Sequence, residues 1–177
     1  MADVVQISPV AADQAETLAR LLQLYLHDFS AFAPLESPYG EIGEDGSFAC
    51  PNLASYLSEP HREALLVRVR GRLAGFMLIN NWSASGRPVD FAIAEFFIAR
   101  KYRRCGIGTE TTGHVIGARP GQWEVAVLAD NTPAMAFWRR ALPAVHSGAI
   151  EVMDGDGDRW RGSIFRFDTR TSAPLLD

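Results

Sequence analysis

Two neighbouring stretches of this sequence combine residue types that bind anions and move protons. The first is the run Arg-Arg-Cys-Gly-Ile-Gly at residues 103–108, which follows an apolar segment ending at Ile98. A turn from a buried strand into a helix exposes unpaired N–H groups and the positive end of the helix dipole. Gly106 and Gly108 have no Cβ atom, so an anion can approach the backbone there, and the two arginines add positive charge. The pattern predicts a phosphate-binding turn.

Other glycine-rich phosphate motifs do not fit this turn. The dinucleotide fingerprint requires a third glycine at the position that Thr111 occupies, and the Walker loop requires a Gly-Lys-Ser/Thr ending that the sequence lacks. Four cations lie within residues 100–104, and a solvated basic surface is the plainer interpretation of such a cluster. Its place directly before the glycine turn favours a bound anion instead.

The second stretch places a carboxylate inside an apolar strand. Glu95 interrupts the apolar segment from Ile93 to Ile98. A buried carboxyl should have a raised pKa, which suits a proton acceptor near neutral pH. Side-chain alternation along a strand predicts that Ile93, Glu95 and Phe97 share one face. The alternative interpretation is a structural carboxylate paired with an arginine or with backbone donors, and the sequence leaves both open.

Apolar spacing predicts the elements that hold these residues in place. Helices are expected over about 12–26, 52–58 and 132–142, and an ordered loop over 27–46. Strands are expected near 4–8, 64–69, 73–79, 90–98, 123–128, 149–153 and 160–167, with a hairpin turn at 70–72. With a helix after the glycine turn, this order predicts an α/β fold, a mixed sheet with helices on both sides.

Length and composition limit the classes of function. A chain of 177 residues with 47% apolar and 21% charged residues fits one globular domain, residues 1–177. The net charge of −4 argues against a general nucleic-acid binder. No apolar run is long enough to span a bilayer and no secretory signal begins the chain, so we expect no membrane association and a cytoplasmic protein.

No metal is expected either. The four histidines and two cysteines lack metal-ligand spacing. The acidic run from Asp154 to Asp158 lacks the glycine and the final acidic ligand of a calcium loop, because Arg159 and Phe165 stand there. We expect this run to form a hairpin turn.

A further segment, Asn-Thr-Pro-Ala-Met-Ala-Phe-Trp at residues 131–138, completes a recognisable pattern. With it, residues 3–168 resemble the GNAT superfamily of acyl-CoA N-acyltransferases. Arg103, Gly106 and Gly108 match the family's Arg/Gln-x-x-Gly-x-Gly/Ala, and residues 131–138 resemble its Asn-x-x-Ala-x-x-Phe-Tyr. The resemblance implies a mixed, mostly antiparallel sheet of about seven strands with helices on both faces. It also implies a GNAT-type N-acetyltransferase that moves an acetyl group from acetyl-CoA directly to a primary amine of a small molecule or peptide.

The resemblance also implies roles for individual residues. Glu95 would be the catalytic base, as some members carry a glutamate in this strand that often acts through water. Ile98 would pair its backbone with the pantetheine arm as an added strand would. Asn131 would lie beside that arm, and it also suits the N-cap of a helix; the two roles are compatible. The residues expected to bind the cofactor are Phe97, Ile98, Arg103, Arg104, Cys105, Gly106, Ile107, Gly108, Thr109 and Asn131.

Two features depart from what the resemblance implies. The helix expected after the turn contains three threonines and Gly113, and glycine alone costs about 1 kcal/mol relative to alanine in a helix. Trp138 stands where many members have a tyrosine that protonates the departing thiolate, and an indole cannot do so. Three alternatives stay open: the thiolate leaves without an enzymic acid, another group such as Tyr102 serves, or activity is lost. In the last case the protein would be a non-catalytic acyl-CoA-binding sensor or regulatory module.

Other candidates are weaker. The Cys105 thiol could carry an acyl group, although its backbone is the favoured contributor. The resemblance places acceptor specificity in the loop at 27–58, whose candidate residues are Asp28, Tyr39, Glu41, Glu44 and Asp45. Dimers are common in the family, so a homodimer is one partner that the resemblance implies, but the sequence identifies no interface.

Overall fold

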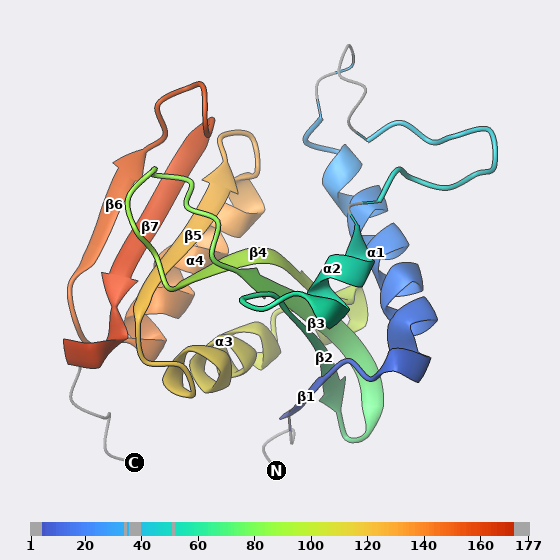
Figure 1. Cartoon of the computed structure of the whole chain (residues 1–177), viewed down its shortest axis with the longest axis horizontal. Coiled ribbons are helices and arrows are strands. Elements are labelled where there is room, and N and C mark those ends of the chain that lie inside the picture. The colour runs from blue at the N-terminus through green and yellow to red at the C-terminus, as the bar shows by residue number, and fades with distance from the viewer. Residues whose placement is uncertain (1–4, 34, 36–39, 51, 172–177) are drawn as a thin grey trace.

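A seven-stranded sheet runs through the centre of the protein, and helices cover both of its faces (Figure 1). The structure is a computed structural model, and it describes residues 5–33, 35, 40–50 and 52–171. The strand order is β1-β2-β3-β4-β5-β7-β6, and every neighbouring pair is antiparallel except β4 and β5, which are parallel. The strands are β1 (Val5–Pro9), β2 (Glu63–Val69), β3 (Arg72–Asn80), β4 (Phe91–Ile98), β5 (Gln122–Leu128), β6 (Ile150–Asp154) and β7 (Gly162–Asp168).

Each face of the sheet has its own apolar core. Leu18 and Leu22 on one face pack with Phe76 of β3. On the other face, Val115 and Trp138 pack with strand residues that include those of β5. The helices are α1 (Ala15–Ser30) and α2 (Leu53–Ser58) on the first face, and α3 (Ile107–Gly117) and α4 (Thr132–Val145) on the second, with short 3₁₀ turns at Ala12–Gln14, Arg100–Tyr102 and Thr169–Thr171. The predicted fold class and order of elements are confirmed.

A β-bulge at Ala94 corrects one prediction about β4. Leu78 of β3 pairs with Glu95, but the next residue, Ile79, pairs with Ile93, so Ala94 is an extra residue on β4. An extra residue shifts side-chain alternation by one position. Phe97 therefore packs in the core under α1, whereas Ile93 packs in the core under α3 and α4. The prediction that Ile93, Glu95 and Phe97 share a face is wrong for Ile93.

The two central strands part beyond the bulge. β4 and β5 pair only at Phe91–Trp123, Ala92–Glu124 and Ile93–Val125. From there β4 stays with β3 as far as Ile98, while β5 stays with β7 as far as Leu128. The facing edges of β4 and β5 therefore separate over the last residues of both strands (Figure 1).

Helix α3 forms despite its unfavourable composition, and its contacts explain why. The hydroxyl groups of Thr111 and Thr112 donate to the carbonyl oxygens of Ile107 and Gly108 at 2.7 and 2.8 Å, so both buried threonines are satisfied within the helix. A Cβ atom at Gly113 would lie 3.2 Å from Cγ1 of Val145. The glycine thus lets α3 lie close against α4, and tertiary contact outweighs propensity.

Helix α1 is longer than predicted. The loop expected from residue 27 begins only after Ser30, because the helical spacing continues and Phe29 contacts Tyr25 one turn earlier, at 5.4 Å between ring centroids. Asp28 and Phe29 therefore lie on the helix. Three other loop candidates, Glu41, Glu44 and Asp45, are exposed, and Tyr39 lies outside the described residues.

Replacing Gly75 by alanine should destabilise the strand pair that carries Glu95. A Cβ atom at Gly75 would lie 1.9 Å from the carbonyl oxygen of Phe97, so the backbone of β4 would have to move. We expect the free energy of unfolding to fall by about 2 kcal/mol or more in urea denaturation, as for overpacked cores. Gly117→Ala is the control, because its Cβ position is open and alanine favours a helix by up to about 1 kcal/mol. Equal stability of Gly75→Ala and the parent would contradict this register.

Candidate active site where β4 and β5 part

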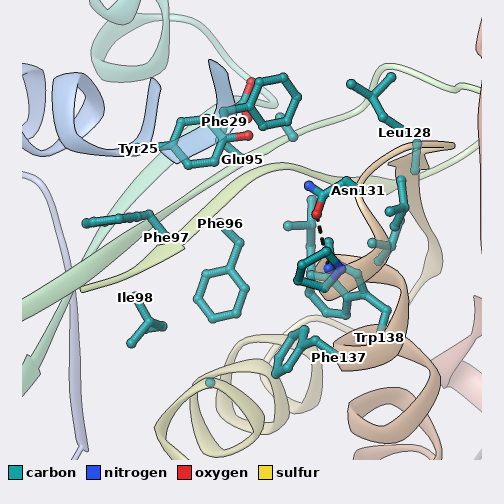
Figure 2. Close-up of a pocket in the computed structure, with 18 of the residues that line it drawn as sticks. Tyr25, Phe29, Glu95, Phe96, Phe97, Ile98, Leu128, Asn131, Phe137 and Trp138 are labelled. Carbon is teal, nitrogen blue, oxygen red and sulfur yellow. Dashed lines mark hydrogen bonds between the residues drawn. The ribbon is translucent and has the colours of Figure 1, made fainter. Parts of the chain in front are cut away.

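A cavity of about 1590 Å³ occupies the region where β4 and β5 part. Its walls come from the C-terminal end of α1, the separating ends of β4 and β5, the turn before α3 and the start of α4. Figure 2 shows Glu95 beside Tyr25 and Phe29 at one end, and Phe137 and Trp138 beside α3 and α4 at the other. The cavity therefore joins the two stretches that the sequence singled out.

Glu95 lies on the wall of this cavity toward α1. Burial raises its pKa to about 7, and a hydrogen bond with Tyr25 acts in the opposite direction. Burial also raises the pKa of Tyr56, and the charge of Glu95 contributes to that increase, so these two side chains lie near each other. Of the other described carboxylates that line the cavity, Asp28 and Glu124 are both held by arginines.

The turn before α3 has the backbone shape expected of an anion site. Gly106 is the N-cap of α3 with φ +87°, and no heavy atom of the described residues lies within 4 Å of the position that a Cβ atom would occupy. The first N–H groups of the helix point out of this end without an intrahelical partner. Gly108 serves a different purpose, because a Cβ atom there would lie 3.0 Å from Cε2 of Phe137 on α4. The Cys105 thiol donates to the carbonyl oxygen of Tyr102 at 3.0 Å and so is used inside the turn.

Asp28 holds two arginines of the basic stretch. Its carboxylate lies 2.6 Å from Nη2 of Arg100 and 2.5 Å from Nη2 of Arg103. Partial burial raises the pKa of Asp28, but the hydrogen bonds and charges of the two arginines outweigh it and hold the pKa below its ordinary value. Arg104, whose φ is +63°, stays exposed at the turn. The sequence analysis assigned the positive charge of this stretch to a bound anion. Part of that charge is instead balanced by Asp28 of α1.

The open edge of β4 ends at Ile98. The N–H of Ala99 donates to Ala74 of β3, and because alternate residues of a strand face opposite neighbours, the polar backbone groups of Ile98 face the side of β5. Nε of Arg103 donates to the Ile98 carbonyl oxygen at 2.6 Å. Across the cavity, Oδ1 of Asn131 accepts from the N–H of Ala134 at 3.1 Å, and Figure 2 shows its amide nitrogen turned away from the helix. The N-cap prediction for Asn131 is confirmed.

The aromatic residues of the cavity differ from those weighed in the sequence. Trp138 is 5% exposed and packs against Phe96 and Phe137, with ring centroids 5.8 and 4.8 Å away. Tyr102 packs against the core cluster around Ile98 and Ile107, whereas the described tyrosines that line the cavity are Tyr25 and Tyr56. The sequence analysis placed Tyr25 only within the helix expected over 12–26 and did not single out Tyr56. Their side chains come near Glu95 only through contacts between residues that are far apart in the sequence.

A buried ion pair fixes the rim of the cavity. Glu124, 1% exposed, accepts from Nη1 of Arg166 at 2.5 Å and from the N–H of Ala84 at 2.9 Å. Further bonds come from Ser83 and Ser85, so the β3–β4 loop is tied across β5 and β7. Sequence analysis missed Glu124, although it gives the same signal as Glu95: a carboxylate inside an apolar strand.

Two features of the described residues bear on the wider predictions. Within those ranges, no group of three or more His, Cys, Asp or Glu residues is arranged to hold a metal ion. No helix in the described part of the chain is long and apolar enough to cross a membrane.

Solved structures of acetyltransferases share this fold. An acetyltransferase from Thermus thermophilus superposes with a TM-score of 0.63 at 15% identity, over 93% of this chain and 97% of the other. The PaiA N-acetyltransferase from Thermoplasma acidophilum, in complex with coenzyme A, gives 0.61 at 14% identity, over 93% and 99%. The ribosomal-protein-S18-alanine N-acetyltransferase from Escherichia coli gives 0.55 at 12% identity, over 98% and 99%.

Sequence comparison assigns the family. No curated protein sequence matches the chain significantly. The model of the Acetyltransferase (GNAT) family, however, matches residues 18–142, which extend from α1 through both segments of the predicted resemblance into α4. With that match and the shared fold, the chain belongs to the GNAT acetyltransferase family, a family of acyltransferase enzymes.

Proposed function

We propose that the protein transfers an acetyl group from acetyl-CoA directly to the nitrogen of a primary amine, on a small molecule or a peptide. Family membership supports acetyl transfer. The observation that supports transfer to an amine is the environment of Glu95, which suits a general base. Its carboxyl lies on the wall of the cavity, and burial raises its pKa to about 7. A general base works best when its pKa lies near the operating pH.

The chain has groups that fit the pyrophosphate and the pantetheine arm of acetyl-CoA, which supplies the activated thioester. The open space at Gly106, the N–H groups of the first turn of α3 and the exposed Arg104 suit the pyrophosphate. The edge of β4 at Ile98 suits the pantetheine arm by strand-like pairing. We propose that Phe97, Ile98, Asn131 and residues 103–109 bind the cofactor. Arg103, held by Asp28 and by the Ile98 carbonyl, would orient the turn rather than contact phosphate alone.

Glu95 takes the first proton that the acceptor's ammonium group must lose, directly or through water. The nitrogen lone pair then forms the new C–N bond, the C–S bond breaks, and the second proton of the nitrogen passes to the departing thiolate. This proton balance needs no separate acid, in keeping with the position of Trp138 in the core. Holding both reactants in one cavity can lower the barrier by about 7–11 kcal/mol, so no acyl-cysteine at Cys105 is required.

Gly106→Trp should weaken acetyl-CoA binding by on the order of 100-fold, because an indole would fill the space beside the helix N-terminus and displace charge-assisted hydrogen bonds. Gly71→Trp is the matched control, since Gly71 also has a positive φ, +76°, and an open Cβ position, but it lies in the β2–β3 hairpin. Calorimetric titration with acetyl-CoA measures both. Unchanged affinity in Gly106→Trp, or equal losses in both variants, would refute the assigned turn.

Glu95→Gln should lower kcat by about 10²–10⁴-fold, the usual contribution of a general base. In the parent, kcat should fall as the pH drops through about 7, because Glu95 becomes protonated, and the variant should lose this dependence. Thiol release over a panel of amines gives both readouts, and Glu16→Gln, an exposed change on α1, is the control. A parental rate and pH profile in Glu95→Gln would remove Glu95 from the mechanism. Acetyl-CoA binding without thiol release from any amine would favour the sensor interpretation.

Glu95→Gln should also affect thermal stability, and its effect relative to the parent should increase as the pH rises. Because the folded-state pKa of Glu95 is raised from 4.5 to about 7, its contribution to stability is present below about 4.5 and is lost as the pH rises through about 7. Glutamine stays neutral, so the Tm of Glu95→Gln minus that of the parent should be larger at pH 8 than at pH 5. A constant difference across this range would show that Glu95 is not buried as described.

A further inference from the structure

Tyr25 and Phe29 of α1 lie beside Glu95 at the end of the cavity away from the α3 turn. The ring of Tyr25 lies 5.4 Å from that of Phe29 and 6.3 Å from that of Phe97, and Phe29 lies 6.2 Å from Phe32. Figure 2 shows Tyr25 and Phe29 directly beside the Glu95 carboxyl. The described polar partner of Glu95 there is the Tyr25 hydroxyl, which is carried by an aromatic ring.

A second aromatic wall is built from the rim of the cavity. The rings of Trp82 and Trp160 lie 6.3 Å apart, and the Arg159 guanidinium lies 5.6 Å from the centre of the Trp82 ring. Nε1 of Trp160 donates to the Val127 carbonyl oxygen at 3.3 Å, so the end of β5 fixes this indole. Although Trp82 is 46% exposed, it too is held in place. Exposed aromatic surface fixed at the mouth of a cavity is typical of a binding site.

A chain of hydrogen bonds runs from the second wall to Tyr56, near Glu95. The backbone N–H of Trp82 donates to Oδ1 of Asn80 at 3.0 Å, and Nδ2 of the same asparagine donates to the Tyr56 hydroxyl at 3.0 Å. The charge of Glu95 helps to raise the pKa of Tyr56, so Tyr56 lies near the Glu95 carboxyl. The backbone that carries Trp82 is therefore linked by fixed contacts to a tyrosine near Glu95.

The charges at the Glu95 end of the cavity favour an acceptor with one ammonium group. Asp28 is balanced by Arg100 and Arg103, and Glu124 by Arg166, so Glu95 is the lining carboxylate whose described partner is a neutral hydroxyl. It can attract one ammonium group, and aromatic faces also attract cations. The described residues around it offer apolar surface to the remainder of the acceptor.

From this arrangement we propose that the acceptor is a primary amine whose nitrogen lies a few bonds from a flat apolar ring, with the ammonium group at Glu95 and the ring between the aromatic walls. This inference rests on the proposed function, since it names the acceptor class of the same site. An apolar site also favours the neutral form of the amine, which is the form that attacks the thioester.

A panel of simple amines tests the acceptor class through kcat/KM for thiol release. We expect kcat/KM for 2-phenylethylamine to exceed that for n-butylamine and for ethanolamine at least tenfold, equivalent to about 1.4 kcal/mol. Spermidine, with further charges and no ring, should be poorer still. The dipeptide amide Phe-Gly-NH₂ is included because the same ring can come from a peptide N-terminus. A higher value for the dipeptide than for 2-phenylethylamine would assign the ring to a peptide, and the reverse to a small molecule.

Variants of Phe29 test whether the aromatic residues of α1 cause the preference for an amine that carries a ring. Phe29→Leu keeps an apolar side chain and Phe29→Ala removes it, and both should lower the ratio of kcat/KM for 2-phenylethylamine to that for n-butylamine, by at least about threefold and tenfold respectively. The ratio is insensitive to a general loss of folded enzyme. Leu24→Ala is the control, because Leu24 is an exposed apolar residue of the same helix, 56% accessible, and its loss should leave the ratio unchanged.

The outcomes separate this inference from the proposed function. Equal or higher kcat/KM for n-butylamine, ethanolamine or spermidine would overturn the acceptor class while upholding amine acetylation. An unchanged ratio in both Phe29 variants would overturn the role of the α1 wall. Absence of thiol release with every amine, although acetyl-CoA still raises the Tm, would overturn the proposed function itself and the acceptor class with it.

Discussion

β4 and β5 lie side by side for three residue pairs and then separate, and the candidate site depends on that separation. A strand edge inside a protein exposes N–H and C=O groups that must find partners. Here the Ile98 carbonyl accepts from Arg103, which belongs to the turn before α3. The bulge at Ala94 occurs at the same point and turns Glu95 toward α1, while Ile93 stays on the opposite face. One irregularity in the sheet thus accompanies the cavity, the open edge and the direction of the carboxyl.

The two carboxylates in the central strands show how environment decides a residue's chemistry. Glu124 meets Arg166, Ser83 and Ser85, so its charge is fully hydrogen-bonded and it holds the rim in place. Glu95 meets the Tyr25 hydroxyl and apolar surroundings, so its proton is retained up to a higher pH. A buried charge that lacks an ionic partner shifts its pKa instead of remaining ionised. The local sequence could not decide which glutamate has an ionic partner, because Arg166 follows Glu124 by 42 positions.

The features that the sequence predicted depend on local interactions, and the features that it missed depend on residues far away in the chain. Element order and fold class are set by apolar periodicity and turn residues, which act locally, and these predictions are confirmed. The bulge at Ala94 changes a face through one residue, and periodicity cannot detect a slip that depends on the partner strand. Helix α3 contradicts local propensity, because its glycine and threonines suit close contact with α4. Of the candidate site, the turn was visible in sequence, whereas Tyr25, Tyr56 and Trp82 emerged only from the assembled walls.

Helix α1 connects the two ends of the cavity. Its last turns carry Tyr25 and Phe29 at the Glu95 end, and between them in sequence lies Asp28, which holds Arg100 and Arg103. Such pairs contribute little energy when exposed, but the guanidinium of Arg103 also donates to the Ile98 carbonyl, so its position is fixed from two directions. A shift of α1 by the width of a side chain would therefore move the aromatic wall and the basic side of the turn together. In the proposed reaction the nitrogen of the acceptor and the thioester must meet within bonding distance, so a helix that contacts both surfaces would help to set the separation between the two reactants.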